Sequence, residues 1–336
     1  MNITKDPGAR QLWRAAWCEA SHGRSGFWRH ARPDDHFRTG PMTSGIVARL
    51  LGAFCEQHGI GAVIDIGAGD GTLLTSLANS HPALDLYGVD LRPAPDTLAP
   101  TVAWATDTWQ VSLTDSPDDA RPNHSGWTSG EAEVLLATLD RPTLIVAHEW
   151  LDDLPTTVII DGHDAAVDDD GSPIAGAPLS GADRDWLQRW WPAALENGQA
   201  EVGTTRDEAW SAVLSPLRSV GGFGLMIDYG HTTADRRATL TGFRAGQQVE
   251  PIPDGTMNLT AHVAVDAVAA AADRIGDRRV LARQHEVFDT GLFGVRPPPP
   301  PATDNPITAL AERSTRTLTH HRQGDLWWLL HQVHRS

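Results

Sequence analysis

The stretch Val63-Ile64-Asp65-Ile66-Gly67-Ala68-Gly69-Asp70-Gly71-Thr72-Leu73-Leu74 decides the fold. Its apolar first half predicts a buried strand at 62–66, and the glycines at 67, 69 and 71 lead directly into a helix predicted over 70–79. Glycine has no Cβ, so these positions can adopt unusual dihedral angles and let a bulky ligand contact the main chain. The free N–H groups at the start of the helix attract a carboxylate or a phosphate. The alternative is a tight strand-to-helix turn without a ligand.

A second apolar run, Leu84 to Val89, ends in Asp90, 23 residues after Gly67. A carboxylate at the end of the next strand can hold the hydroxyls of a ribose. The glycines and Asp90 together therefore predict half of a nucleoside-binding site.

The spacing of the glycines distinguishes a dinucleotide site from a site for a nucleoside ligand without a pyrophosphate. The dinucleotide fingerprint is G-x-G-x-x-G, whereas here the third glycine comes one residue early and Thr72 takes the sixth place. This spacing disfavours a pyrophosphate. The pattern G-x-G-x-G, with Asp65 two residues before it, resembles motif I of class I S-adenosylmethionine methyltransferases. The resemblance implies that Asp65 faces the methionine amino group.

Composition narrows the classes of function. The chain has 336 residues, 40% of them hydrophobic, which is enough for one large or two smaller domains. A net charge of −16 argues against general nucleic-acid binding. Cys18 and Cys55 are too few for a disulfide framework, and the histidines are scattered, so we expect no metal. With no long apolar run and no apolar core near Met1, we expect a cytoplasmic protein without a membrane span.

Strands and helices alternate along the first half of the chain, which predicts a parallel sheet covered by helices on both sides. We expect a helix at 44–57 with Ser44 as its N-cap, and a hairpin within an insertion that covers the active face. Together with the motif I resemblance, this predicts a doubly wound, seven-stranded α/β fold of the Rossmann-like class I methyltransferase type with an inserted α/β subdomain. The further expected elements are strands at 84–90, 102–105, 143–147 and 223–227, helices at 129–139, 186–195, 208–217 and 307–319, hairpin strands at 158–160 and 164–167, a polyproline connector at 297–301, and a final edge strand at 325–333. The expected parts are an N-terminal helical segment (1–60), a cofactor-binding half (61–155), the insertion (156–215) and a second half of the core (216–336).

Polar side chains follow two further strands at the edge where ligands bind in such sheets. Glu149 and Asp152 are three residues apart, so on a helical turn both can face one way and hold a guanidinium by paired hydrogen bonds. For Asp153 we favour an acid that stabilises the start of a helix. Asp228, Tyr229 and His231 follow the strand at 223–227, and Asp107 follows the third strand. We expect Tyr229 and His231 to contact substrate, and Asp107 either to accept a hydrogen bond from an adenine amino group or to be an exposed loop residue.

Six blocks of sequence, spanning about 22–294, resemble the MidA family in their order. The family consists of class I methyltransferases, and its mitochondrial members dimethylate an arginine in a subunit of respiratory complex I during assembly. The resemblance implies that Asp65, Gly67, Gly69, Gly71 and Asp90 hold S-adenosylmethionine, that Thr39 borders it, and that Glu149, Asp152 and Asp228 line the acceptor side. The chain departs from the family at Gly40-Pro41-Met42, at Ala68 and Asp70, and at Trp150-Leu151. The six blocks are 36–41, 65–73, 147–155, 227–231, 255–263 and 283–291.

These observations predict a methyltransferase that uses S-adenosylmethionine and acts on a protein, with an arginine side chain as the candidate acceptor. Two alternatives stay open: an assembly factor that binds a partner protein without catalysis, and an oxidoreductase that uses NAD. We expect no nucleic-acid partner, and the sequence does not give the oligomeric state.

Overall fold

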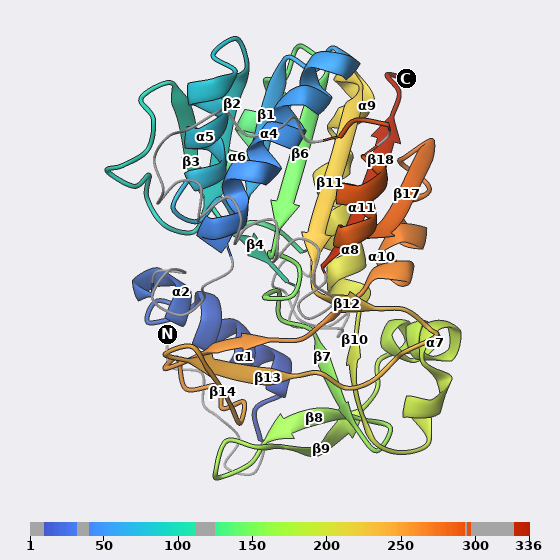
Figure 1. Ribbon diagram of the computed structural model, residues 1–336. Helices are drawn as coiled ribbons and strands as arrows, with labels where there is room; N and C mark the ends of the chain where they lie inside the picture. The colour runs from blue at the N-terminus through green and yellow to red at the C-terminus, as the bar shows by residue number, and fades with distance from the viewer. Residues whose placement is uncertain (1–9, 32–39, 112–124, 293, 297–325) are drawn as a thin grey trace.

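The computed structural model describes residues 10–31, 40–111, 125–292, 294–296 and 326–336 (Figure 1). Thr39, the polyproline run and the helix predicted at 307–319 lie outside these ranges. Among the described residues, no helix combines the length and the apolar character needed to cross a membrane.

A seven-stranded sheet forms the core, in the order β17-β18-β11-β6-β1-β2-β3. Neighbouring strands from β11 to β3 are parallel, and β18 is antiparallel to both of its neighbours. The doubly wound fold predicted from the sequence is therefore confirmed. The strands are β1 (Ala62–Ile66), β2 (Asp85–Asp90), β3 (Val102–Thr106), β6 (Thr143–His148), β11 (Gly222–Asp228), β17 (Arg278–Arg283) and β18 (Trp327–Val333).

The last strand has a different place from the one predicted. We expected 325–333 at the edge of the sheet, but β18 lies between β11 and β17. The reason is that β18 is apolar on both faces: Trp328 and Leu330 pack into one side of the core, and Leu329 into the other. The edge is taken by β17, a strand that we did not predict, and its exposed first residues Arg278 and Arg279 suit an edge position.

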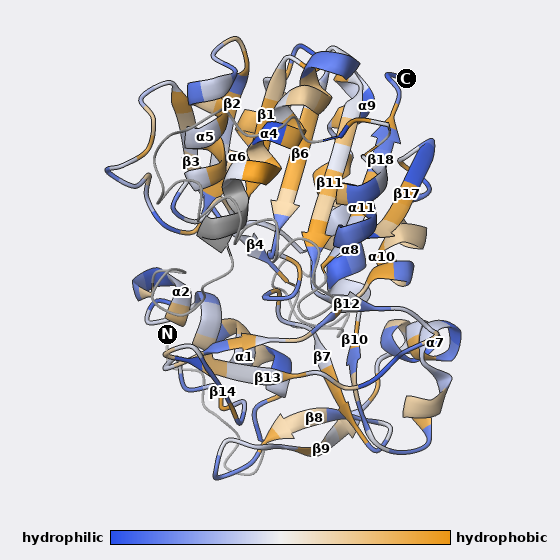
Figure 2. Ribbon diagram, in the orientation of Figure 1, coloured by the Kyte–Doolittle hydropathy of each residue, from blue (hydrophilic) through white to orange (hydrophobic). Residues whose placement is uncertain are grey.

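Helices cover both faces of the sheet, and successive strand residues alternate between them. Leu144 and Val146 of β6 face one helical layer, whereas Ile145 and Ala147 face the other. Figure 2 shows the resulting hydrophobic colour of the central strands. One layer contains α4 (Gly40–His58), α5 (Thr72–Ser80) and α11 (Gln284–Thr290); the other contains α6 (Glu131–Ala137), α8 (Thr204–Leu214), α9 (Leu217–Val220) and α10 (Val265–Ala272). The predicted N-cap of α4 is wrong, because the helix begins at Gly40 and not after Ser44.

A second lobe lies beyond the carboxyl ends of the parallel strands, where the arrowheads of β6 and β11 point in Figure 1. A four-stranded sheet, β10-β7-β8-β9, and a three-stranded sheet, β14-β13-β15, form its centre. The predicted hairpin is β7 paired with β8, whereas β9, β10 and the three-stranded sheet were not predicted. The elements of this lobe are α1 (Trp13–His22), α2 (Phe27–His30), β7 (Thr157–Ile160), β8 (His163–Val167), β9 (Pro173–Pro178), α7 (Gly181–Trp190), a 3-10 turn (Pro192–Leu195), β10 (Gln199–Val202), β13 (Thr241–Arg244), β14 (Gln247–Val249) and β15 (Asn258–Thr260).

Each face of the β7–β8 hairpin is covered by a different part of the chain. Ile159 packs against α7, and its neighbour Val158 packs against Trp13 and Trp17 of α1. Leu12 also forms a bridge with Ala166 of β8. The first helix therefore belongs to the second lobe, whereas α4 belongs to the core. Short paired strands lie between the second lobe and the core: β4 (Trp109–Gln110) with β5 (Gly126–Trp127), and β12 (Gly230–His231) with β16 (Val263–Ala264).

Candidate active site

The glycine loop after β1 is attached to the end of β2. Gly67, Gly69 and Gly71 have φ angles of +70°, +59° and +65°, which other residues adopt only under strain. The Gly67 N–H donates to the carbonyl of Val89 at 2.8 Å, and the Gly69 N–H donates to Asp90 Oδ2 at 2.8 Å. The sequence-predicted glycines and acid therefore meet at the carboxyl edge of the sheet.

Asp90 also holds Arg92. Its Oδ1 accepts hydrogen bonds from the Arg92 backbone at 2.8 Å and from Arg92 Nε at 3.2 Å. Arg92 Nη1 in turn lies 3.4 Å from Asp70 Oδ1 and donates to the carbonyl of Ala31 at 3.3 Å. Burial raises the pKa of Asp90, and the charge of Arg92 opposes that rise. Arg92 thus joins the glycine loop, the end of β2 and the segment after α2.

The segment after β6 starts with a strained residue. Glu149 has a φ of +51°, and its N–H donates to the carbonyl of Ile227 at 2.8 Å. The Glu149 carboxylate lies 3.5 Å from His148 Nε2. Burial, followed by the nearby charge of Asp152, raises the pKa of Glu149 to about 8. Burial lowers the pKa of His148 to about 4, so this imidazole is neutral at pH 7.

Asp228 is fully buried and connects this segment to the end of β11. Its Oδ2 accepts from the N–H groups of Leu151 and Asp152 at 2.9 and 3.3 Å, and its Oδ1 accepts from the Tyr229 N–H at 2.8 Å. Burial and the charge of Asp152 hold its pKa well above the usual range of an aspartate. Asp228 is therefore placed to fix the backbone of Leu151 and Asp152.

One pocket opens at this edge, with about 650 Å³ of empty space that includes some open to solvent. Predicted residues on its wall are Gly67, Gly69, Asp90, Asp107 and Glu149. The wall also contains residues that we did not assign to the site: His22, Trp28, Arg92, Thr108, Trp127, Trp150, Asp153 and Leu154, with Ile66, Val89 and Leu91 at the strand ends.

Several predicted site residues are not on the wall: Asp65, Gly71, Asp152, Asp228, Tyr229 and His231. Asp65 is buried inside β1, where burial and then the charge of Asp90 raise its pKa to about 8. The Asp152 carboxylate turns toward Thr260, whose hydroxyl donates to Oδ2 at 2.8 Å. Thr39 lies outside the described residues.

The acids at 152 and 153 therefore have the reverse of the environments that we expected. The expectation was based on a helical turn, but residues 149–154 form an irregular segment with a turn in which Leu154 N–H donates to the carbonyl of Leu151. Asp153 thereby joins Glu149 on the pocket wall. The acidic run and the family block 147–155 were the sequence signals for Asp153 and Trp150, and no sequence pattern pointed to Trp127.

Asp107 lines the pocket, and its carboxylate is occupied by protein donors. Its Oδ1 accepts from Thr108 N, Thr128 Oγ1 and Ser129 N, each at 2.9 Å, and its Oδ2 accepts from Ala132 N at 3.1 Å. These bonds satisfy N–H groups at the start of α6, as a cap does.

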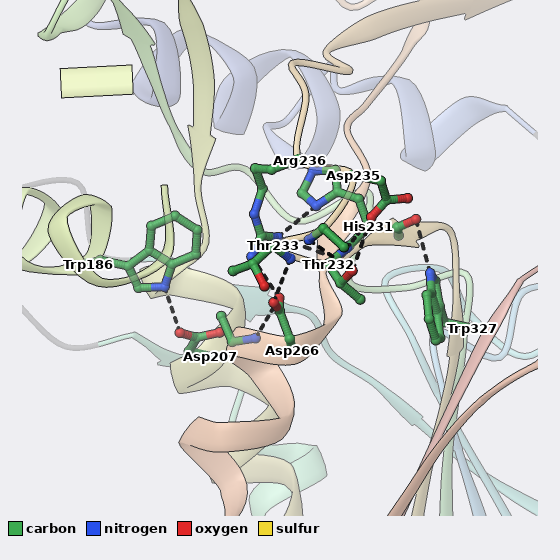
Figure 3. A network of polar contacts seen from close by, with 12 residues as sticks. Trp186, Asp207, His231, Thr232, Thr233, Asp235, Arg236, Asp266 and Trp327 are labelled. Atoms are coloured by element: carbon green, nitrogen blue, oxygen red, sulfur yellow. Dashed lines mark hydrogen bonds and ion pairs between the residues drawn. The ribbon is translucent and has the colours of Figure 1, made fainter. Parts of the chain in front are cut away.

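His231 lies in a neighbouring polar network (Figure 3), two residues after Tyr229 in the sequence. His231 Nδ1 is 2.7 Å from Arg236 Nη1, and Arg236 Nη2 donates to Asp266 Oδ1 at 2.7 Å. Burial and then the charge of Arg236 lower the pKa of His231 to about 3. Tyr229 stacks on His262 with ring centroids 5.9 Å apart. The network holds the loop after β12 against α10.

Comparison with known proteins gives a consistent picture. No curated protein matches the chain. Residues 118–282, just under half of the chain, match the model of a family described as "Putative S-adenosyl-L-methionine-dependent methyltransferase". A Burkholderia thailandensis protein crystallised with S-adenosyl-homocysteine superimposes with a TM-score of 0.64 at 17% identity, covering 98% of this chain and 89% of that one. A native crystal structure of an uncharacterized protein from the same organism superimposes with a TM-score of 0.63 at 18% identity, covering 98% of this chain and 88% of that one. The chain thus has the fold of these Burkholderia proteins, and the segment that carries Glu149, Asp153 and Asp228 is similar to a methyltransferase family.

Proposed function

We propose that this protein transfers a methyl group from S-adenosylmethionine to a nitrogen of a protein side chain, with arginine as the acceptor. The single observation that carries the proposal is the pocket that brings the glycine loop, Asp90 and Glu149 onto one wall. The family match over 118–282 and the relative crystallised with S-adenosyl-homocysteine support the choice of cofactor.

The residues at the pocket fit such a cofactor. A Cβ at Gly67 would come within 2.8 Å of Trp150 Cδ1, so the loop has no room for a side chain there. Gly67, Gly69 and Asp90 would hold the nucleoside part, and Asp65 lies directly behind them in β1. When bound, S-adenosylmethionine supplies a methyl group whose carbon–sulfur bond breaks with the electron pair left on sulfur.

The protein's contribution to such a displacement is alignment and the exclusion of water. A guanidinium has a pKa above about 12 and must lose a proton as the new nitrogen–carbon bond forms. Glu149 lies on the pocket wall, and its raised pKa of about 8 suits a group that orients the guanidinium and accepts that proton. Asp228 acts as a positioning residue through its bonds to Leu151 and Asp152.

The Glu149→Gln variant tests this assignment. We expect S-adenosylhomocysteine affinity, measured by calorimetry, to stay within a few fold of the wild type, because Gln has the shape of the protonated carboxyl. We expect most transfer of labelled methyl groups into proteins of the host lysate to be lost. The exposed Glu133→Gln on α6 is the matched control. Transfer at the wild-type rate by Glu149→Gln would refute the role of Glu149.

The two alternative functions, an oxidoreductase and a non-catalytic assembly factor, give results that differ from those of a methyltransferase. An oxidoreductase would be stabilised against heat by NAD and not by S-adenosylhomocysteine. A non-catalytic assembly factor would bind S-adenosylhomocysteine but incorporate no label into any protein of the lysate.

A further inference from the structure

Four carboxylates line the pocket, and they fall into two pairs: Asp90 with Asp107, and Glu149 with Asp153. The first pair is already used by the protein. Asp90 accepts from Gly69 and Arg92, and Asp107 accepts four hydrogen bonds around the start of α6. Asp107 therefore has little left to offer a ligand, whereas Asp90, whose Oδ2 accepts from Gly69, keeps accepting capacity for the nucleoside part of the cofactor and is not available to the acceptor.

The second pair, Glu149 and Asp153, can still accept hydrogen bonds from a ligand. Asp153 receives a hydrogen bond from the Asn258 side chain, but its Oδ1 is buried without a partner. A buried carboxylate oxygen without a donor is costly, so a ligand that donates to it gains binding free energy. Among the residues that the structure describes, the polar side chain beside the Glu149 carboxylate is His148, which its lowered pKa keeps neutral.

No cation of the protein compensates this pair on the described pocket wall. Arg92 is the arginine there, and it is bonded to Asp90 and Asp70. His22 also lines the wall, but burial lowers its pKa to about 4. The described wall therefore holds no cation that pairs with Glu149 or Asp153, and since burial raises the pKa of both carboxyls, a bound cation would favour their ionised forms.

Aromatic faces add to this preference. Trp127 and Trp150 line the same pocket and stack with ring centroids 6.4 Å apart and 18° between their planes. The face of an indole attracts an organic cation. A wall of two carboxylates and two tryptophans has the chemistry of a site for a cationic nitrogen group.

We propose that Glu149 and Asp153 form the acceptor subsite and that Asp153 determines its specificity for a positively charged nitrogen group, an inference that rests on the proposed function. The order of strands separates this subsite from the nucleoside end: Glu149 and Asp153 follow β6, whereas the glycine loop and Asp90 follow β1 and β2. A neutral acceptor would supply no counter-charge for either carboxylate.

The cation could in principle be the acceptor or the sulfonium of the cofactor, and two arms of one experiment distinguish them. The first arm measures the affinities of N-acetyl-arginine amide and its neutral analogue N-acetyl-citrulline amide for protein saturated with S-adenosylhomocysteine. The second compares S-adenosylmethionine, a cation, with S-adenosylhomocysteine, which lacks the sulfonium charge.

We expect wild-type protein to prefer the arginine probe by about tenfold or more, and Asp153→Asn to lose most of that preference, because one charged hydrogen bond is removed. Asp153→Glu keeps the charge and should keep the preference. Asp185→Asn, an exposed acid on α7, is the charge-matched control. S-adenosylhomocysteine affinity and its ratio to that of S-adenosylmethionine should stay within about twofold in Asp153→Asn.

Three results would overturn the proposal. Wild-type protein that binds the citrulline probe as tightly as the arginine probe has no cation-selective subsite. An unchanged arginine preference in Asp153→Asn removes Asp153 from that subsite. A fall in S-adenosylmethionine affinity relative to S-adenosylhomocysteine in Asp153→Asn would assign the carboxylate to the sulfonium. Failure of the proposed function is distinct, because the wild-type protein would then either not bind S-adenosylhomocysteine or bind it without transferring label to any protein of the lysate.

Discussion

Asp152 and Asp153 are adjacent in the sequence but have different surroundings, because the backbone before them has an unusual conformation at Glu149. The positive φ of Glu149 and the two N–H groups bonded to Asp228 fix how residues 150–153 leave β6. Asp152 is thereby directed to Thr260 inside the protein, and Asp153 to the pocket. Strained backbone at such a point is frequent in functional sites, where the surrounding contacts hold it.

Gly67 offers a test at the scale of one residue. Its φ is +70°, and a Cβ would meet Trp150 at 2.8 Å, so we expect Gly67→Ala to lower S-adenosylhomocysteine affinity at least about tenfold. Gly59→Ala is the control, because Gly59 has a φ of +66° but nothing within 4 Å of an added Cβ. Both variants should lose about 1 kcal/mol of stability from backbone strain. Calorimetric titration that finds equal affinities in the two variants would contradict a ligand-binding role of the loop.

At the scale of elements, α8 holds the acidic segment against the second lobe through one side chain. Arg206 is fully buried and donates to backbone carbonyls of residues 152, 154, 261 and 262 at 2.7–3.3 Å. Its charge also lies near Asp152, Asp228 and Glu201 and lowers the pKa of each from what burial would give. One buried cation therefore serves both the backbone and the carboxylates around it.

Substitutions of Arg206 test whether its charge and its donors stabilise the fold. We expect Arg206→Met to reduce the free energy of unfolding by about 3–5 kcal/mol, because the carbonyls and the acids lose their shared partner. Arg206→Lys keeps the charge but has fewer donors, so its loss should be intermediate. Urea denaturation measures both values. An Arg206→Met variant as stable as the wild type would mean that this charge cluster contributes nothing to folding.

At the scale of the whole molecule, the second lobe completes the pocket. Glu149 and Asp153 come from the core, whereas His22 and Trp28 come from α1 and α2 of that lobe. Arg92 joins the two parts through the Ala31 carbonyl. The site thus depends on residues more than a hundred positions apart in the sequence, which meet only when both lobes fold.

The buried acids and histidines set the pH dependence of stability for the whole chain. The pKa values of Asp65, Glu149 and Asp207 are raised to about 8, so the folded protein holds protons that the unfolded chain releases near pH 4. Stability from these groups falls as the pH rises toward 8. The buried histidines act in the opposite sense, and their effect fades above about pH 6.5, where the unfolded chain holds progressively fewer of their protons. These histidines have pKa values lowered to about 4 (His22, His148, His262 and His331) or about 3 (His231).

Between pH 7 and 8 the acids outweigh the histidines, because most histidines of the unfolded chain are then already neutral, so we expect the free energy of unfolding to fall over this interval. Each carboxyl that keeps its proton contributes up to about 1.4 kcal/mol per pH unit. Urea denaturation at pH 7.2 and 8.0 measures the slope, and Glu149→Gln should make it shallower by removing one titrating group. A free energy of unfolding that rises from pH 7.2 to 8.0 would show that these acids are ionised in the folded state.

The sequence by itself determined the features that depend on local pattern. The run from Val63 to Leu74 specifies strand, loop and helix through apolar period and glycine position, and Asp90 follows from the next strand, because the carboxyl ends of parallel strands meet at one edge. The β7–β8 hairpin is equally local. By contrast, the position of β18 was decided by a partner strand, β17, that shows no strong apolar pattern, and the choice between Asp152 and Asp153 was decided by Asp228, some 75 residues away. Contacts between distant segments carry no local period, so only the tertiary structure placed Asp153, Arg92, Trp127 and Trp150 on the wall of one pocket.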